Sequence, residues 1–337
     1  MKQKPTISLI VLNYNGLQHL KEYFESVFEQ SLQPDEVIMM DNASTDGSVQ
    51  FVQKYFPQVK IIKNPSNDGT ALGSNIAFEH TSGDLVVFQS NDLKLDERCV
   101  EYLVKTIQSD PQIGIVTSVL LKHLMVNNKK QLVIDNAGGV CDVYGFGMQK
   151  YPEAKHQNIP EIEEVFFSYG GSFIIRRKIF GQVGGYDKRY FTLNDDIDLS
   201  WRVRLLGYKI VYQKKSFVLH KVSATLGTLF NRSIKRYWSE RNAMRTLLKN
   251  HTFISLIRFL PIYFLLQMGE MGFFLYRARF DLFWSDIKAV LWNLWYLSET
   301  IKMRRYIQRH KNRSDLHTMQ AKRSYKLMLF SSLKNSI

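Results

Sequence analysis

Three aspartates and a histidine in the second half of the chain are the residues best suited to chemistry. Asp195, Asp196 and Asp198 stand within four positions, and His220 follows at the end of a strand-like segment. An ionised carboxylate can accept a proton, and a neutral imidazole can bind a cation. The same acids would also stabilise the start of the helix expected at 199–204, because negative charge is favourable at a helix N-terminus. The elements around them decide between the two interpretations.

Strands and helices alternate through the first 92 residues. We predict strands at 7–12, 36–40, 59–62 and 85–88, and helices at 17–31, 48–55 and 73–80. The strands are short and almost entirely apolar, as in a parallel sheet that is buried on both faces. This order predicts an α/β, doubly wound sheet, in which ligands bind beyond the carboxyl ends of the strands.

The stretch that follows, to about residue 220, has a mixed pattern. A helix is expected at 97–109, and strands are expected at 113–117, 173–175 and 209–212. The polar, glycine-rich segment 127–164 predicts a hairpin and a loop whose length indicates a function or mobility.

Polar residues follow each of the four strands predicted in the first half. These segments are 13–16, 41–48, 64–69 and 89–92. Tyr14 offers a ring on which a base can stack, Asp41 can accept from a base N–H or a ribose hydroxyl, and Asp92 can hold a divalent cation against a diphosphate. Each segment alone would also suit a turn or a helix cap. Four such segments at one sheet edge predict a nucleotide-sized pocket.

Composition and motif spacing argue against several classes of protein. The chain lacks a Walker-type glycine loop, and its glycines at 69 and 73 lack the spacing of the dinucleotide fingerprint, which argues against a nucleoside triphosphatase or a dehydrogenase. Cys99 and Cys141 lie far apart, which favours a reduced cytosolic setting over a disulfide scaffold. The first residues run straight into a predicted strand, so we expect no signal peptide.

The C-terminal third differs in kind from the rest. Segment 253–275 is crowded with large apolar residues, a second helical pattern carries Trp284, Trp292 and Trp295, and 302–334 holds ten Lys or Arg and one acid. Apolar helices followed by a basic tail predict an interfacial membrane anchor. A buried helical bundle or a partner interface would fit the same pattern. A spanning helix is disfavoured because Arg258, Pro261 and Glu270 interrupt the longest apolar segment.

The net charge of +14 suits phosphate-bearing ligands, anionic lipid or nucleic acid. The positive charge is concentrated after the apolar helices and does not alternate with aromatic residues on the sheet, so we expect no nucleic-acid partner. We therefore divide the chain into a catalytic domain at 1–250 and a helical, basic, membrane-associating region at 251–337.

These segments together resemble family 2 glycosyltransferases. The resemblance rests on 10–16, 41–48, 67–69 with Gly73 and Asn75, 89–92, 184–187, 195–198 and His220, which occur in the family's order and cover about residues 6–250. Segment 237–242 resembles the bacterial rhamnosyltransferase-like branch. The resemblance implies a GT-A fold, a Rossmann-like, mixed but mainly parallel sheet flanked by helices.

The resemblance also implies roles for individual residues. Asp196 would be the general base, and Asp92 and His220 would hold Mg²⁺ or Mn²⁺ on the donor diphosphate. The acceptor would meet Gly170, Gly171, Asp195 and Trp201. The nucleotide-binding residues would be Leu12, Asn13, Tyr14, Asn15, Asp41, Asn67, Gly69, Gly73, Asn75 and Asn91.

Two positions depart from the family pattern. Ser90 replaces the first acid of the Asp-x-Asp-type motif, so one carboxylate and one imidazole offset less diphosphate charge, which bears on metal dependence. Asp195 replaces the usual Glu, and its shorter arm weakens the expected acceptor contacts.

The chemistry of the residues agrees with sugar transfer. Such a reaction needs a leaving diphosphate with neutralised charge and a base that takes the acceptor's hydroxyl proton. One base without a second nucleophilic carboxylate implies direct displacement with inversion. Asp198 is expected to face Arg202, one helical turn on, in a structural role.

We expect a dTDP-rhamnose or UDP-sugar donor and a glycan or polyprenyl-linked acceptor, in cell-surface polysaccharide synthesis. The enzyme would act at the cytoplasmic face of the membrane as a peripheral or monotopic protein, and a homo-oligomer stays open. Two alternative interpretations are a nucleotidyltransferase and an inactive GT-A scaffold at the membrane. A nucleotidyltransferase would need a basic loop near the first strand to bind a triphosphate.

Overall fold

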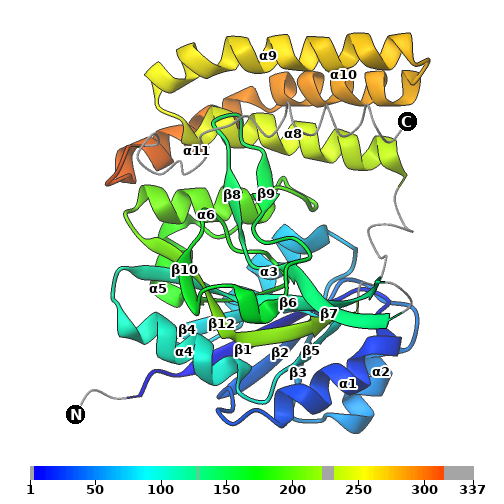
Figure 1. Cartoon of the computed structure of the whole chain (residues 1–337), viewed down its shortest axis with the longest axis vertical. Coiled ribbons are helices and arrows are strands. Elements are labelled where there is room, and N and C mark those ends of the chain that lie inside the picture. Colours follow the sequence, from blue (N-terminus) through cyan, green and yellow to red (C-terminus); the bar gives the residue numbers. More distant parts are fainter. Residues whose placement is uncertain (1–3, 127–128, 222–230, 315–337) are drawn as a thin grey trace.

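The computed structural model describes residues 4–126, 129–221 and 231–314. A large sheet flanked by helices forms one end of the molecule, and a layer of long helices forms the other (Figure 1). The basic tail predicted at 302–334 lies partly outside the described residues, from residue 315 onward.

The main sheet has ten strands and is mixed. Its order is β10-β12-β6-β11-β4-β1-β2-β3, with β5 paired to β12 and β7 paired to β6. The strands are β1 (Ile7–Asn13), β2 (Glu36–Asp41), β3 (Lys60–Lys63), β4 (Leu85–Ser90), β5 (Leu93–Leu95), β6 (Ile113–Val126), β7 (Lys129–Asn136), β10 (Ile162–Glu164), β11 (Ser172–Arg176) and β12 (Lys209–His220). Strands β1 to β4 are parallel, as predicted, so their carboxyl ends share one edge.

Helices connect and cover these strands. They are α1 (Leu17–Phe28), α2 (Ser48–Tyr55), α3 (Gly69–Glu79), α4 (Cys99–Ser109), α5 (Arg177–Val183) and α6 (Asp195–Leu205). Helix α3 begins four residues before the predicted start, because Gly69 adopts a φ of +80° that lets the chain turn into the helix there. Helix α6 also begins earlier than predicted, so the acidic residues form its first turn.

The predicted hairpin between 127 and 164 is present in more detail than the sequence pattern indicated. Strands β6 and β7 form a long antiparallel pair, and β8 (Gly139–Cys141) and β9 (Gly147–Gln149) form a second, separate hairpin. A short 3₁₀ turn, η1 (His156–Asn158), leads to β10. Strands β6 and β12 run well beyond their predicted ends because they pair with each other in parallel across a bulge.

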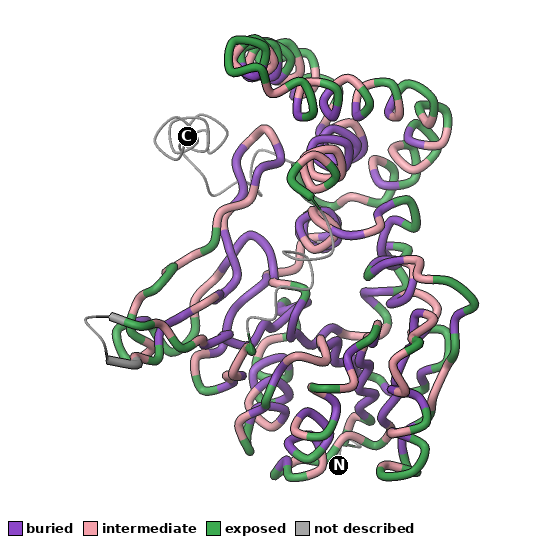
Figure 2. The backbone as a smooth tube through the Cα atoms, turned by 90° about the vertical axis from the view of Figure 1, so that its right-hand side faces the viewer, coloured by how far each residue is buried: buried purple, intermediate pink, exposed green. Residues whose placement is uncertain are grey.

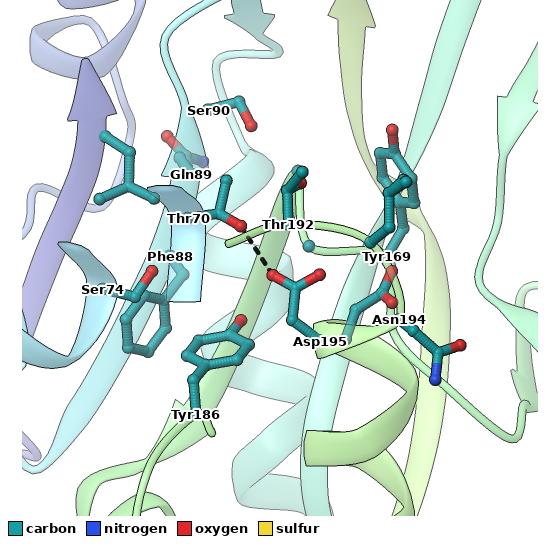
Figure 3. Close-up of a pocket in the computed structure, with 15 residues that line it drawn as sticks. Thr70, Ser74, Phe88, Gln89, Ser90, Tyr169, Tyr186, Thr192, Asn194 and Asp195 are labelled. Atoms are coloured by element: carbon teal, nitrogen blue, oxygen red, sulfur yellow. Dashed lines mark hydrogen bonds between the residues drawn. The ribbon is translucent and has the colours of Figure 1, made fainter. Parts of the chain in front are cut away.

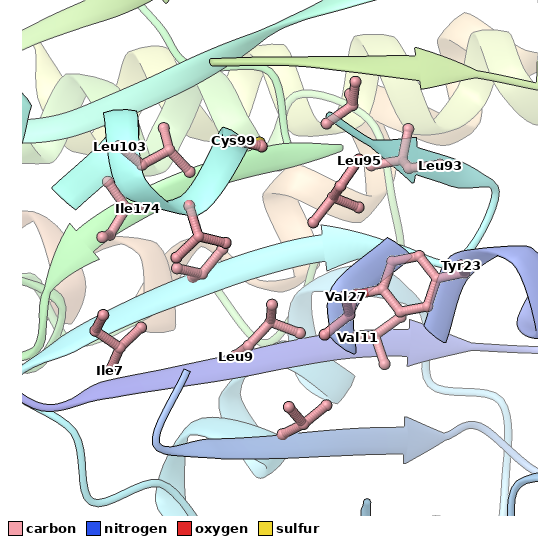
Figure 4. Packing of buried hydrophobic residues seen from close by; sticks show 14 of the residues in the cluster. Ile7, Leu9, Val11, Tyr23, Val27, Leu93, Leu95, Cys99, Leu103 and Ile174 are labelled. Atoms are coloured by element: carbon pink, nitrogen blue, oxygen red, sulfur yellow. The ribbon is translucent and has the colours of Figure 1, made fainter. Parts of the chain in front are cut away.

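Apolar residues pack on both faces of the sheet. On one face, Leu9 and Val11 of β1 lie against Tyr23 and Val27 of α1 and against Leu103 of α4 (Figure 4). A second buried cluster lies on the other face, against α3, α5 and α6. Burial on both sides explains why the sequence of these strands is nearly continuous in apolar residues.

A helical layer follows the sheet domain. It consists of α8 (Arg232–Asn250), α9 (Phe253–Tyr276), α10 (Phe280–Trp295) and α11 (Leu297–His310). Helix α8 packs along α10, and α11 returns toward α8. The helices predicted in this region are therefore present, whereas the functional division at residue 250 stays a prediction.

Candidate active site

A cavity of about 200 Å³ lies beyond the carboxyl ends of β1 and β4. Helix α6, the loop before it and the start of α3 close the other side (Figure 3). Its lining residues are Leu12, Thr70, Ser74, Phe88, Gln89, Ser90, Tyr169, Gly170, Gly171, Tyr186, Thr192, Leu193, Asn194, Asp195 and Asp196. The cavity occupies the place where ligands bind in sheets of this kind.

Asp195 and Asp196 lie together at the first turn of α6 and face this cavity. Thr70 Oγ1 donates to Asp195 Oδ2 at 2.7 Å, and the backbone N–H of Ile197 donates to Asp196 Oδ1 at 2.8 Å. Burial, reinforced by the neighbouring charge of Asp195, raises the pKa of Asp196 to about 7. Burial also raises the pKa of Asp195 above its ordinary value. A carboxylate with a pKa near 7 is well matched to accept a proton at neutral pH.

Asp198 follows on the same helix but points into the protein. Arg202 Nη2 contacts its Oδ2 at 2.8 Å, and Lys249 Nζ contacts its Oδ1 at 3.0 Å. The expected contact between Asp198 and Arg202 is confirmed. Asp187 joins the same buried cluster through Arg245 and Lys249, so α6 and α8 are held together by paired charges.

Asp92 and His220 meet at the end of β12. Antiparallel pairing of β12 with β5 sets His220 opposite Leu93, next to Asp92 in sequence. His220 Nε2 lies 3.3 Å from Asp92 Oδ2. Its other nitrogen, Nδ1, lies 2.7 Å from Asp135 Oδ2, and Lys122 Nζ lies 3.1 Å from the second oxygen of Asp135.

This arrangement suits a divalent cation. A metal-binding histidine typically donates its other ring N–H to a carboxylate, which is the place that Asp135 takes against His220. Within the described ranges, no three His, Cys, Asp or Glu side chains form a cage that would hold an ion by themselves. Mg²⁺ and Mn²⁺ fit such a sparse protein set, because substrate phosphates and water complete their coordination. Burial opposes the charged form of His220, but hydrogen bonds to Asp135 and Asp92 raise its pKa to about 9 in the metal-free protein.

The tips of β1 and β2 are tied to each other. Asn13 Nδ2 donates to Asp41 Oδ1 at 2.9 Å, and Asn91 Nδ2 donates to Asn13 Oδ1 at 2.6 Å. Asn15 Oδ1 accepts from the backbone N–H of Thr45 at 2.8 Å. Tyr14 is partly exposed between them. Asn13, Asn15, Asp41 and Asn91, four of the predicted nucleotide-binding residues, therefore lie in one hydrogen-bonded network at this edge of the sheet.

The predicted residues at the start of α3 serve to hold loops. Asn67 Oδ1 accepts from the N–H of Gly69 at 3.1 Å, and a Cβ on Gly69 would lie 2.0 Å from the carbonyl oxygen of Phe191. Asn75 bonds both the N–H and the carbonyl of Tyr186, at 2.8 and 2.9 Å. Gly73 packs against Asn42. Asn75 and Gly69 therefore hold the loop that carries Tyr186 to Asn194, whereas Asn67 and Gly73 contact Gly69 and Asn42 near the ends of β3 and β2. Among the predicted nucleotide-binding residues that the structure describes, Leu12 lines the cavity.

Of the four residues predicted to meet the acceptor, three lie at the cavity and Trp201 does not. Gly170, Gly171 and Asp195 line the cavity. Trp201 is fully buried, with its ring edge-on to those of Phe166 and His251. Its position two turns along α6 directs it into the helical layer, so it does not border an acceptor.

Two residues of the site were not identified from the sequence. Asp135 lies in the segment predicted as a hairpin and a loop, and its pairing with His220 depends on the register of the β6–β7 hairpin. Tyr169 lines the cavity, and burial raises the pKa of its hydroxyl, helped by the charges of Asp196, Asp135 and Asp92. Charges from both acidic sites therefore act on the Tyr169 hydroxyl. The glycine pair after Tyr169 was a signal for a tight loop, although it did not reveal the tyrosine.

Solved structures show which class of fold this is. GalNAc-T7 with UDP, GalNAc and Mn²⁺ superposes with a TM-score of 0.60 at 16% identity, over 74% of this chain and 48% of that one. The mannosyltransferase PcManGT of Pyrobaculum calidifontis, with GDP-Man and Mn²⁺, superposes with a TM-score of 0.51 at 16% identity, over 91% and 86% of the two chains. The chain therefore has the GT-A fold of nucleotide-sugar transferases.

Sequence comparison identifies the family. A model of glycosyl transferase family 2 matches residues 8–184. N-acetylglucosaminyl-diphospho-decaprenol L-rhamnosyltransferase of Mycobacterium tuberculosis is 26% identical over 238 residues, which cover 66% of this chain and 78% of that protein. Poly-beta-1,6-N-acetyl-D-glucosamine synthase of Staphylococcus aureus is 22% identical over 236 residues, which cover 69% of this chain and 54% of that protein. The chain belongs to glycosyl transferase family 2, and it is a glycosyltransferase.

Proposed function

We propose that this enzyme transfers a sugar from a nucleoside diphosphate to an acceptor hydroxyl with inversion, and that Asp196 is the general base. The observation that carries the proposal is the pair of acidic sites at one sheet edge. Asp196 lines the cavity with a pKa raised to about 7 by burial and by the charge of Asp195, and Asp92, which follows the carboxyl end of β4, lies 3.3 Å from His220. A base on one side and charge neutralisation on the other are what direct displacement requires.

The proton accounting of the step is simple. The acceptor hydroxyl attacks the anomeric carbon, its proton passes to the Asp196 carboxylate, and the bond to the donor diphosphate breaks, leaving the nucleoside diphosphate with the electron pair. Asp195 borders the acceptor and keeps Asp196 basic through its like charge. Thr70 fixes Asp195 by its 2.7 Å hydrogen bond.

The nucleoside is assigned to the edge formed by Asn13, Tyr14, Asp41 and Asn91. Tyr14 is accessible for stacking on a base, whereas Asn13 and Asp41 are buried and orient each other. Asn15, Asn67, Gly69, Gly73 and Asn75 support this edge and the loop above the cavity. A dTDP-rhamnose or UDP-sugar donor remains our proposal, and the rhamnosyltransferase relative favours the first.

Asp92 and His220 would hold Mg²⁺ or Mn²⁺, which supplies positive charge to the diphosphate when it is bound. Asp135 is assigned a positioning role: it holds Nδ1 of His220 so that Nε2 faces Asp92. Solved structures of the same fold contain Mn²⁺, which supports a divalent ion here.

The acceptor is proposed to be a glycan or polyprenyl-linked saccharide, as the name of the mycobacterial relative indicates for that protein. An enzyme that acts on such a lipid would lie at the cytoplasmic face of the membrane and take part in cell-surface polysaccharide synthesis. One described helix, α9, has the length and apolar composition of a membrane span, which by itself is weak support.

A panel of nucleotide sugars tests the donor and the ion together. Thermal stabilisation is measured for UDP-, dTDP- and GDP-sugars with and without Mn²⁺, and the best donor is then used in a transfer assay. We expect one donor to raise the melting temperature more with Mn²⁺ than without it. Stabilisation by nucleoside triphosphates with pyrophosphate release would support a nucleotidyltransferase instead, and binding without transfer to any acceptor would support an inactive scaffold.

A further inference from the structure

Helix α9 has its polarity reversed relative to a helix on the surface of a water-soluble protein. Its five buried residues are Ser255, Tyr263, Gln267, Glu270 and Phe274, four of which carry polar groups. Most of its exposed side chains are large and apolar, with exposed fractions of 71% for Phe253, 78% for Ile254, 62% for Ile257, 66% for Leu265, 66% for Met268 and 84% for Tyr276. A helix in water buries its apolar stripe and exposes its polar one. Here the polar stripe is inside, so the outer stripe suits an apolar medium.

Helix α10 extends the same surface. Trp284, Leu291, Leu294 and Trp295 are 56%, 59%, 61% and 81% exposed. Helix α10 packs against both α8 and α9, and α9 is the helix farthest from the sheet (Figure 1), with exposed positions along its outer side (Figure 2). We call the exposed apolar residues of α9 and α10 the outer face. An apolar surface of this extent marks an interaction site.

The charges near the outer face favour an anionic bilayer as the occupant. Arg258 on α9, Arg277 in the turn after it and Lys288 on α10 are exposed. The exposed acid of this region, Asp281, is paired with Arg279 at 3.0 Å. Exposed tryptophans and a tyrosine beside apolar residues and cations are the composition of a surface that sits in the headgroup region of a membrane.

A buried ion cluster fixes how α9 lies. Arg236 of α8 contacts Glu240 at 3.2 Å, Glu270 of α9 at 2.6 Å and Asp286 of α10 at 2.8 Å. Tyr263 of α9 also donates to Glu240, at 3.1 Å. Turning α9 to cross a bilayer would separate Glu270 from Arg236 and move its carboxylate into hydrocarbon, at a high cost. The cluster therefore holds α9 alongside α8 and α10.

We propose that the outer face docks on an anionic lipid bilayer with α9 lying in the plane of the membrane, anchored on one leaflet without crossing it. This deepens, and rests on, the membrane location proposed above. Docking leaves the catalytic cavity on the water side, because the sheet domain lies on the opposite side of α8 (Figure 1). The acceptor's lipid can then stay in the same leaflet while its sugar reaches the cavity.

The test uses the full-length protein and vesicles of phosphatidylcholine with equal phosphatidylglycerol. Co-sedimentation is measured for the wild type, for Leu265→Glu with Met268→Glu, and for a matched control, Tyr55→Glu with Met125→Glu, which changes exposed apolar residues of the sheet domain. We expect the α9 pair to weaken binding at least 10-fold and the control to leave it unchanged. Wild-type binding by the α9 pair, or equal loss in the control, would overturn the proposal.

Labelling distinguishes an in-plane helix from a spanning one. Phe253→Cys and Tyr276→Cys mark the two ends of α9, and the native cysteines are buried. In-plane docking predicts that vesicles change the labelling of both ends by an external impermeant maleimide in the same way, because both ends lie at the same leaflet. Protection of one end would show a span and refute the orientation. A lipid-free dimer that Leu265→Glu with Met268→Glu converts to a monomer would show a protein interface instead, and would also refute it.

A separate readout keeps this test independent of the enzymatic proposal. Thermal stabilisation by UDP with Mn²⁺ is measured on the same variants, which leave the cavity untouched. If vesicle binding follows the prediction while no nucleotide stabilises the protein, the proposed function fails and the docking face stands. Nucleotide binding without vesicle binding gives the opposite result.

Discussion

Two pairs of acidic residues, one at the start of α6 and one formed by Asp198 of α6 with Asp187 of the preceding loop, differ in their partners. Asp198, with Asp187 beside it, is surrounded by Arg202, Arg245 and Lys249. In the same helical turn, Asp195 and Asp196 bond to a threonine hydroxyl and to backbone N–H groups, and burial raises the pKa of both, with the charge of Asp195 adding to the effect on Asp196. Carboxylates that are paired with Arg or Lys (compensated carboxylates) hold helices and loops together. Carboxylates that bond only to neutral groups (uncompensated carboxylates) have a raised pKa and can take up a proton near neutral pH.

The largest effect is expected when a carboxylate is removed from the buried cluster of paired charges. Asp198→Asn leaves Lys249 and Arg202 with less opposing charge in a fully buried site, and removing one partner of such a pair costs about 3–5 kcal/mol. We expect a clear fall in the unfolding midpoint in urea. Asp281→Asn, at an exposed surface pair, is the control and should leave the midpoint nearly unchanged. Equal stability of the two variants would remove the distinction between the sites.

A smaller effect is expected where a carboxylate orients the imidazole. Asp135→Asn retains the size of the side chain but weakens its hold on His220 Nδ1, and such changes lower metal affinity about 10–100-fold. The Mn²⁺ dissociation constant, measured by electron paramagnetic resonance with UDP present, checks this. Glu153→Gln is matched, since Glu153 lies near the same Lys122 at 3.9 Å without touching His220. An unchanged Mn²⁺ affinity in Asp135→Asn would contradict the positioning role.

The smallest effect is expected at Asp195 and Asp196, where a substitution shifts the pH dependence of turnover. Ionised Asp196 is the active form, so turnover should rise with pH through about 7 in the wild type. Asp195→Asn removes a like charge, which lowers the pKa of Asp196 and moves this rise toward lower pH, by about one unit if the charge is worth about 1.4 kcal/mol. The pH profile of kcat/KM measures the shift, with exposed Glu29→Gln as control. A rise that stays in place would mean that Asp195 does not tune the base.

The sequence was informative where function depends on strand order. The polar ends of the parallel strands could be placed at one edge because β1 to β4 alternate with helices, and the position of Asp92 follows from this topology. Asp195 and Asp196, which line the cavity from α6, were identified from their spacing and from the family resemblance. The contact between Asp198 and Arg202 could also be predicted, since a spacing of four residues is local to one helix.

The rest depended on contacts between distant segments. Asp135 meets His220 across 85 positions, through a hairpin whose strand pairing and register the sequence did not reveal. Trp201 was misplaced because a helical residue near an active site faces either the cavity or the core, and the packing of Phe166 and His251 decides which. The reversed polarity of α9 depends likewise on Arg236, which lies on another helix.

The rate of sugar transfer by the Asp196→Asn variant tests most directly whether Asp196 is the general base. The substitution keeps the shape of the side chain and removes its ability to accept a proton, which should lower kcat by about 10²–10⁴-fold. Donor affinity should stay within about twofold of wild type, because the nucleoside edge and the metal pair are untouched. The account predicts lost transfer with retained donor binding and retained folding. Wild-type turnover in Asp196→Asn would contradict it.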